Sequence, residues 1–491
     1  MDFSTAQKGS GFDTAEPHGT SKSPEVTSRT VYYPQNSDEI EDIEQYRPGG
    51  YHPVELGDVL HNGQYHVLHK LGHGGFSTVW LAQDTVRREY VAIKIIISEA
   101  SAEGSNIVET IQREREPSSA CFGEFISYPT ATFWIDGPNG RHFSIVSPLA
   151  GPNVAQLVEA TRNGTVDKKY MLEPKVAQRL ALQVTQAMAA LHNSGSGHGD
   201  LTCPNILLEL RSLDHLTPHE IRELLGHSRL EEIARIDGKS AKPTAPEYAI
   251  EPADTLKLLP FWTGNIKVAD FQSSYKLDDP PEDLDTPWSS CSPEYMFSSK
   301  VGKESDIWAL GVAIFQMRSG KELFPEILGG DMEVTLQMVD VLGPMPYNLV
   351  ESIFGPDKDN YCIIAKTATE PTLPDIVHSI NFGDGPGNQE NRKMEVGEGL
   401  EVPSKHEQQV EEETRHSKEL PKQEQQDEDK KSGMEGIESC AESVNEDISS
   451  KISKKEADLF LDLLNGALNY DVEKRLSADE MLRHPWFSKN F

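Results

Sequence analysis

Three glycines in one short run could bring backbone N–H groups close to the oxygens of a phosphate. The run reads Leu71-Gly72-His73-Gly74-Gly75-Phe76-Ser77-Thr78-Val79. Glycine has no Cβ, so its backbone can approach a bound anion closely. No Gly-Lys-Ser/Thr follows and the next segment reads as a strand, which excludes a Walker-type P-loop and a Rossmann turn. Taken alone, the run could equally be a glycine-rich hairpin turn.

A single lysine, Lys94, interrupts the apolar run Val91-Ala92-Ile93-Lys94-Ile95-Ile96-Ile97. An ammonium group in such a strand loses hydration unless it is paired or reaches water. Its position after the glycines favours a role in holding the α- and β-phosphates of a nucleotide, with a carboxylate from the next helix holding the lysine. The alternative is an edge lysine whose head group lies in solvent.

Two polar segments further along could supply a general base and a cation site. The first reads His198-Gly199-Asp200-Leu201-Thr202-Cys203-Pro204-Asn205. An Asp and an Asn five apart on a short loop can face one cleft, where Asp200 would accept a hydroxyl proton and Asn205 would bind Mg²⁺. The second is Asp270, at the end of a strand, where a carboxylate is well placed to hold Mg²⁺ between two phosphates. An ordinary polar turn remains the alternative for the first segment, and chance for the second.

The elements that would position these groups follow from hydrophobic periodicity. The runs 65–71, 78–83 and 90–97 are β-branched or aromatic and read as consecutive antiparallel strands. From Glu173 one apolar stripe recurs at spacings of three and four and stops before Ser194-Gly195, which predicts a helix. Segments 335–342 and 457–468 also read as helices. Strands followed by helices predict an α+β protein with two lobes. The stripe consists of Val176, Leu180, Val184, Met188 and Leu191.

In this order, the four features resemble the signature set of the eukaryotic protein kinases. Three later segments agree with that resemblance. Ser292-Pro293-Glu294 resembles the Ala-Pro-Glu segment, and Arg475 resembles the partner of its glutamate. The run Asp306-Ile307-Trp308-Ala309-Leu310-Gly311 resembles the helix that anchors the catalytic loop.

A narrower resemblance is to the SR-protein-specific kinases and their fungal relatives. The lead-in Gly49-Gly50-Tyr51-His52-Pro53-Val54 and the run Phe76-Ser77-Thr78-Val79-Trp80 are similar to that family. The insertion between Asn205 and Ile266 falls where the family carries its spacer. The resemblance implies a two-lobed kinase fold, with a small β-rich lobe and a larger helical one. It also implies Mg-ATP as phosphate donor and protein substrates, including Arg/Ser-rich segments.

The resemblance also implies a role for each matching residue. The run Leu71 to Val79 would cover the phosphates and Lys94 would position them. Asp200 would be the catalytic base, and Asn205 and Asp270 would hold Mg²⁺.

The same resemblance places the adenine pocket. Ser147 would lie at its back, and Pro148 to Ala150 would form the hinge, with Ala150 at the nucleotide. The carboxylate partner of Lys94 is assigned to Glu109 on spacing, with Glu114 as the alternative.

Three residues depart from the kinase pattern. Gly199 replaces an arginine, so a phosphorylated activation loop would lack its main docking cation. Thr202 replaces the lysine that neutralises the γ-phosphate. Gln272 replaces a glycine and restricts positive φ. These departures keep open a pseudokinase that binds nucleotide or partners without turnover, and a small-molecule kinase is a weaker alternative.

Composition divides the chain into segments. We expect a disordered N-terminal segment at 1–45, a small lobe with its lead-in at 46–150 and a large lobe at 151–491. Within the large lobe we expect a spacer-like insertion at about 209–262 and a disordered acidic insertion at about 381–450.

The whole-chain charge bounds the partners. The 491 residues include 79 acidic and 46 basic side chains, for a net charge of −33, which argues against nucleic acid and suits basic partners. Five scattered cysteines without a CxxC spacing predict neither a disulfide framework nor a zinc site. No secretory signal and no membrane-length apolar run is visible. We therefore expect a cytoplasmic or nuclear monomer without a membrane partner.

Overall fold

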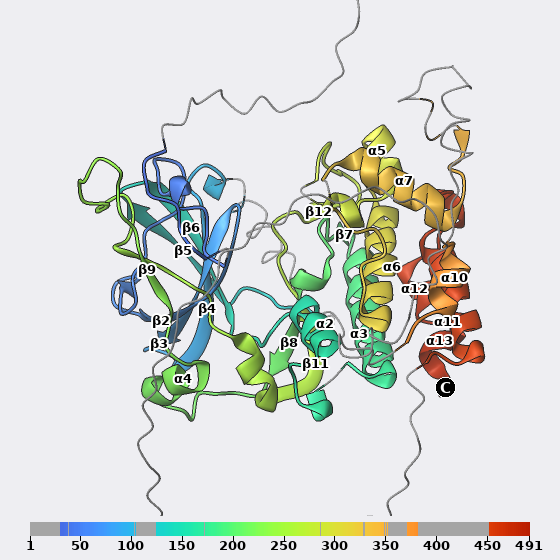
Figure 1. The fold of residues 1–491 in the computed structure, drawn as a ribbon, viewed down its shortest axis with the longest axis horizontal. Helices are drawn as coiled ribbons and strands as arrows, with labels where there is room; N and C mark the ends of the chain where they lie inside the picture. Colours follow the sequence, from blue (N-terminus) through green and yellow to red (C-terminus); the bar gives the residue numbers. More distant parts are fainter. Residues whose placement is uncertain are drawn as a thin grey trace, which may run out of the picture.

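The computed structural model describes residues 30–381 and 451–491, with gaps at 38, 103, 105–123, 171, 285, 328, 348, 350 and 352–370. Figure 1 shows a β-sheet part and a helical part lying side by side, with the C-terminus in the helical part. The expected α+β class and two-lobed arrangement are therefore confirmed. None of the described helices is long and apolar enough to span a membrane.

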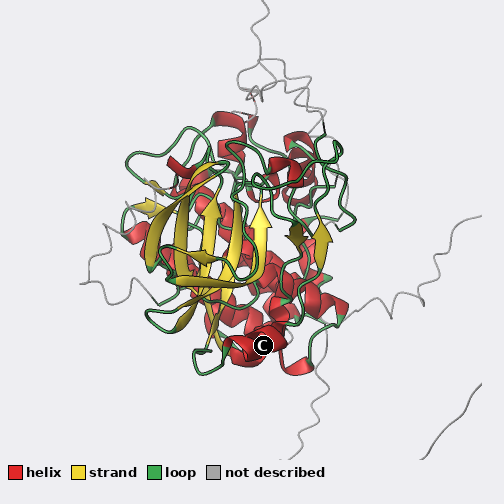
Figure 2. Ribbon diagram, turned by 90° about the vertical axis from the view of Figure 1, so that its left-hand side faces the viewer, coloured by secondary structure: helices red, strands yellow, loops and turns green. Residues whose placement is uncertain are grey.

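The smaller part is an antiparallel sheet of six strands in the order β1-β2-β3-β4-β6-β5. Figure 2 views the molecule from the side of this sheet. Strands β2 to β4 contain nearly all of the three runs predicted from periodicity, and Trp80 and Ile93 lie in the core of the sheet. The strands are β1 (Val59–Leu60), β2 (Tyr65–Gly74), β3 (Ser77–Asp84), β4 (Glu89–Ile96), β5 (Ala131–Gly137) and β6 (Gly140–Pro148).

The larger part is built around α3 (Pro174–Asn193) and α6 (Lys303–Ser319), which pack against each other. Helix α3 carries the predicted stripe, whose members Leu180, Val184 and Met188 are fully buried. It begins with a proline in its first turn, and the chain leaves it through Gly195 at φ 84°. The predicted helix boundaries of this element are therefore confirmed.

The other helices and short strand pairs complete the larger part. Segments 335–342 and 457–468, predicted as helices, fall within α7 and, apart from the last residue, α11. The described helices are α2 (Val154–Asn163), α4 (Pro218–Leu225), α5 (Pro293–Ser298), α7 (Asp331–Leu342), α10 (Leu373–His378), α11 (Lys454–Ala467), α12 (Ala478–Met481) and α13 (Pro485–Ser488). The strand pairs are β7 (Ser196–Gly197) with β12 (Tyr275–Lys276), β8 (Ile206–Leu210) with β11 (Trp262–Val268), and β9 (Leu230–Glu232) with β10 (Tyr248–Ile250).

The expectation of disorder over 1–45 is wrong for its last third. Residues 30–37 and 39–45 are described, and they include the short helix η1 (Ile43–Gln45). Tyr32 and Ile43 are only 2% and 6% exposed. A mean composition missed this because these few apolar residues are buried by a partner distant in sequence, the insertion after β8. Residues 1–29 lie outside the described part.

The insertion between β8 and β11 is folded and packs on the sheet. Ile221 and Leu225 of α4 are buried together with Leu68 of β2 and Leu81 of β3. The acidic tract occupies the chain between α10 and α11, where the backbone of Asn381 pairs with that of Lys451. Residues 382–450 of that tract lie outside the described part, so the expectation of disorder there stays a prediction.

Candidate active site

Lys94 leaves β4 on the face of the sheet that carries the glycine-rich run. The register sets Gly72 opposite Val79, and Val79 opposite Lys94. Directly opposed residues of antiparallel strands point to the same side. The neighbours Ile93 and Ile95 are buried on the other side, whereas the Lys94 side chain is 21% exposed. The pleat therefore directs the ammonium group to the glycine-rich face.

The glycines of the run are not required by backbone conformation. None of Gly72, Gly74 and Gly75 has a positive φ, and a Cβ on any of them would meet no atom within 4 Å. The short hairpin loops that demand glycine do so through positive φ. The absent side chains instead leave open space beside the backbone, which fits a run that an anion approaches closely.

The turn after Asp200 brings Asn205 back onto it. The Nδ2 of Asn205 donates to the backbone carbonyl and to Oδ2 of Asp200, both at 2.8 Å. The turn is the short helix η3 (Cys203–Asn205), which leads directly into β8. These bonds use the amide nitrogen, so the amide oxygen of Asn205 is turned away from Asp200.

Asp306 of α6 anchors this loop through its backbone. Its Oδ2 accepts a hydrogen bond from N of His198 at 2.8 Å, and its Oδ1 accepts one from N of Gly199 at 3.0 Å. The Nε2 of His192 lies 2.9 Å from Oδ2. Burial opposes ionisation, yet His192 and the backbone donors hold the pKa of Asp306 below its usual value. The loop therefore rests on a buried, ionised carboxylate.

Asp270 meets Lys94 across the junction of the two parts. It follows β11 with φ 67°, and its Oδ2 accepts a hydrogen bond from Nζ of Lys94 at 2.6 Å. Burial opposes ionisation, but the Lys94 ammonium group holds the pKa of Asp270 below its usual value. Gln272 has no positive φ, because Asp270 makes the left-handed turn in this segment. The departure at position 272 therefore causes no strain here.

The oxygens at this point fit a hard divalent cation. The Oδ1 of Asp270 is buried and has no hydrogen-bond partner in the described part of the chain. Buried polar atoms need partners, and Mg²⁺ takes carboxylate and amide oxygens while leaving positions for phosphate. No cluster of three or more His, Cys, Asp or Glu side chains able to hold a metal occurs among the described residues. A Mg²⁺ here would be held by Asp270 and Asn205 and completed by phosphate.

Gly199 is dictated by its surroundings. Its φ is 80°, and a Cβ there would lie 2.2 Å from the backbone oxygen of Ser273. Its own carbonyl accepts a hydrogen bond from Oγ1 of Thr286. The segment that begins at Ser273 thus lies directly against the Asp200 loop. The arginine of the family pattern could not be accommodated in this arrangement.

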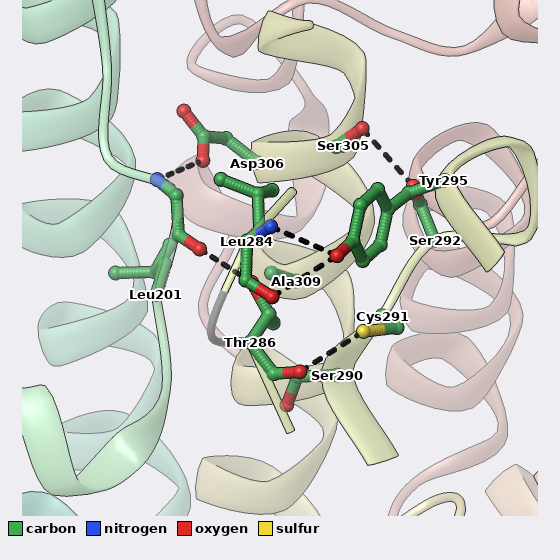
Figure 3. Close-up of a pocket in the computed structure, with 11 residues that line it drawn as sticks. Leu201, Leu284, Thr286, Ser290, Cys291, Ser292, Tyr295, Ser305, Asp306 and Ala309 are labelled. Carbon is green, nitrogen blue, oxygen red and sulfur yellow. Dashed lines mark hydrogen bonds between the residues drawn. The ribbon is translucent and has the colours of Figure 1, made fainter. Parts of the chain in front are cut away.

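Figure 3 shows how this segment, residues 273–291, is held against the loop. The backbone N of Leu284 donates to the hydroxyl of Tyr295 at 2.8 Å, and Sγ of Cys291 contacts the carbonyl of Thr286 at 3.1 Å. A cavity of about 10 Å³, enough for one water, separates the segment from Leu201. The contacts that hold the segment here are neutral hydrogen bonds.

The predicted pair Glu294 and Arg475 is formed. Nη1 of Arg475 lies 2.6 Å from Oε1 of Glu294, and Nη2 lies 2.9 Å from Oε2. Both residues are buried. This two-point contact ties the start of α5 to the chain before α12.

The remaining predicted residues divide into three groups. Ser147 lies opposite Ala92 in the register of β6 and β4, and Pro148 to Ala150 follow as the connection to the helical part. Within the glycine-rich run, Ser77 and Thr78 are buried while Phe76 is 57% exposed at the turn. The two candidate partners of Lys94, Glu109 and Glu114, lie outside the described residues, so that assignment stays a prediction.

Sequence analysis missed the residues that hold the site together over long distances. Thr286 and Tyr295 fasten the segment 273–291, and Tyr51 contacts the glycine-rich run. Each belongs to a segment without a local period or motif that could have indicated its contact.

Comparison with known proteins agrees with this geometry. Residues 65–221 match the protein kinase domain family. The chain resembles, with 17% identity and a TM-score of 0.51, a crystal structure of a kinase domain, over 89% of this chain and 98% of that one. At this identity the likeness concerns the fold.

The curated relatives are serine/threonine kinases. Serine/threonine-protein kinase spk-1 of Caenorhabditis elegans is 30% identical over 44% of this chain and 21% of its own length. Serine/threonine-protein kinase SRPK of Physarum polycephalum is 28% identical over 64% of this chain and 74% of its own. SRSF protein kinase 3 of Homo sapiens is 33% identical over 35% of this chain and 30% of its own. The match thus spans about a fifth of the nematode protein.

Proposed function

The chain carries a eukaryotic protein kinase domain related to the SR-protein kinases, and on this premise we propose that it transfers the γ-phosphate of ATP to serine or threonine hydroxyls of proteins. The observation that carries the proposal is the meeting of four side chains from distant segments. Lys94 contacts Asp270, and Asn205 contacts Asp200, as the chemistry of phosphoryl transfer requires.

Each of these residues has a definite task in the proposed reaction. Asp200 accepts the proton of the attacking hydroxyl, and Asn205 keeps the Asp200 carboxylate oriented. The ammonium group of Lys94 binds phosphate oxygens. Mg²⁺ held by Asp270 and Asn205 supplies the charge that offsets the negative charge of the phosphates.

The glycine-rich run completes the phosphate site. Its backbone N–H groups surround the phosphates from the side of the sheet. The anchored loop and sheet hold donor and acceptor in place, which is the main source of rate in this chemistry.

For the substrate, we propose Arg/Ser-rich protein segments. The names of the related kinases, among them SRSF protein kinase 3, support this choice. The net charge of −33 is compatible with it, because guanidinium groups need carboxylates on which to dock. The acidic character likewise suits a basic protein partner better than a nucleic acid.

A pseudokinase is the second candidate, and Thr202 favours it. This residue stands where the kinase pattern has a lysine, and its side chain is almost buried at 9% exposure. A positive charge that would stabilise the transition state is thus absent from that position. A pseudokinase would bind nucleotide or a protein partner and transfer no phosphate.

Radiolabelled phosphate transfer from Mg-ATP separates the two candidates. The acceptors are an Arg-Ser repeat peptide and a generic basic protein, and Asp200→Asn is the control. Transfer that disappears in Asp200→Asn establishes the kinase, and preference for the Arg-Ser peptide establishes the substrate. A melting shift with Mg-ATP but no transfer to either acceptor establishes the pseudokinase. Transfer to the generic acceptor alone would overturn the substrate proposal and leave the kinase intact.

A further inference from the structure

The chain that precedes the sheet contacts the glycine-rich run directly. The hydroxyl of Tyr51 donates a hydrogen bond to the backbone carbonyl of Gly74 at 2.7 Å. The Nε2 of His73 lies 3.1 Å from the backbone oxygen of Glu39. Both contacts fall on the run itself, and both come from residues 39–51.

The position of the Gly74 carbonyl fixes more than one atom. In a trans peptide, the carbonyl and the N–H of the next residue point in opposite directions. A hydrogen bond that holds the oxygen of Gly74 towards Tyr51 therefore directs the N–H of Gly75 away from Tyr51. Glycine has many accessible backbone conformations, so without such a bond this peptide would reorient freely.

The hydroxyl of Tyr51 is suited to remain a donor. The side chain is buried, at 3% exposure. Burial, together with the carboxylates of Glu41 and Asp42, raises the pKa of Tyr51 to about 12. The hydroxyl therefore keeps its proton throughout the physiological range.

A buried ion pair fastens the same segment to β2. The Nζ of Lys70 contacts Oε2 of Glu41, with the two side chains 0% and 1% exposed. The hydroxyl of Tyr46 donates to Oε1 of Glu41 at 2.6 Å. Without Glu41, an ammonium group would remain buried and unpaired two residues before the run. Residues 39–51 are thus an integral part of the small lobe.

The folded insertion supports this segment from behind. The Nδ2 of Asn139 donates to the carbonyl of Tyr51 at 2.6 Å and to that of Thr244, in the insertion, at 2.8 Å. The backbone of Tyr32 pairs with that of Arg235. A separate hydrophobic cluster joins the three regions, with Tyr32, Ile40, Ile43, Tyr46, Tyr51, Ile97, Ile233, Ala241, Ala245 and Ala249 buried together.

We propose that residues 39–51 form a clamp that sets the glycine-rich run for binding phosphates, with Tyr51 as its positioning residue. The inference rests on the proposed function, because it assigns the clamp to the nucleotide phosphates. The clamp acts through the direction of the Gly74–Gly75 peptide. It therefore affects ligands that carry phosphate and leaves the adenosine part of the site unchanged.

The test compares Mg-ATP with adenosine in Tyr51→Phe, a variant that keeps the ring and removes the hydroxyl. Binding of each ligand is measured by calorimetry on the full chain, with the unfolding temperature alongside. We expect the Kd for Mg-ATP to rise about 3- to 10-fold, as the loss of one neutral hydrogen bond predicts, with the Kd for adenosine unchanged. The control is Tyr33→Phe, in the same segment but 54% exposed, for which both constants should match the wild type.

The outcomes are distinct. An unchanged Kd for Mg-ATP in Tyr51→Phe, or an equal loss for Mg-ATP and adenosine, would overturn the clamp and leave the proposed function standing. A wild-type chain that binds adenosine but gains nothing from the phosphates of Mg-ATP would overturn both. As a second variant, His73→Phe removes the contact with Glu39, and the clamp predicts the same selective loss. Equal Mg-ATP affinity in both variants and the wild type would refute it.

Discussion

The Nζ of Lys94 lies 2.6 Å from Oδ2 of Asp270, so one ion pair joins the middle of the sheet to the end of β11 in the helical part. The side chains are 21% and 31% exposed, so water partly screens the attraction. The pair therefore contributes little to stability, and its value lies in holding two functional groups at one point.

Replacement of Lys94 should separate activity from stability. We expect Lys94→Met to reduce phosphate transfer by about 10²-fold or more, because a charge on the phosphates is lost. The free energy of unfolding should change by only about 1 kcal/mol. The matched control is Lys267→Met, whose ammonium group lies 3.1 Å from Glu209 at 24% exposure. Equal loss of transfer in the two variants would show that Lys94 has no special role.

A methyl group at position 199 should disrupt the site through backbone contact. Gly199→Ala would place Cβ 2.2 Å from the oxygen of Ser273, whereas Gly195→Ala, at a similar φ of 84°, meets nothing within 4 Å. Both variants carry the cost of a left-handed alanine, about 1 kcal/mol. We expect Gly199→Ala to lose at least about 2 kcal/mol more in denaturant unfolding, with most of the transfer activity. Equal losses in the two variants would mean that the segment moves aside at no cost.

The buried pair of Glu294 and Arg475 should be expensive to break from one side. Arg475→Met leaves the carboxylate of Glu294 buried and unpaired, and we expect a loss of about 3–5 kcal/mol in the free energy of unfolding. The double variant with Glu294→Met should recover part of this loss, because the uncompensated charge is gone. A double variant as unstable as the sum of the single ones would contradict this account.

Stability should fall in mild acid through His52. Burial, with the neighbouring His142, lowers the pKa of His52 to about 4. Its folded-state pKa lies below the unfolded value, so its contribution is complete above neutral pH and is lost as the pH falls from about 6.5 towards 4. The loss from this group should reach about 2 kcal/mol at pH 5. In urea titrations, His52→Phe should flatten the decline between pH 7 and 5, and the exposed His219→Gln should not. An unchanged slope in His52→Phe would exclude this origin.

Local patterns in the sequence reached the elements and the order of the functional residues. The strands around Lys94 and the helix before His198 were predicted correctly, because side-chain period is a property of a few consecutive residues. Residues 30–45 were assigned wrongly, since Tyr32 and Ile43 are buried by an insertion some 190 positions later.

The sequence by itself determined which chemical groups the chain carries and in what order, since residue type and local spacing are written in it directly. Only the tertiary structure decided that Lys94 meets Asp270, that Gly199 lies under Ser273 and that Tyr51 holds Gly74. These contacts join residues 23 to 176 positions apart. Contacts at such separations have no period and depend on how whole elements pack, so no local signal could announce them.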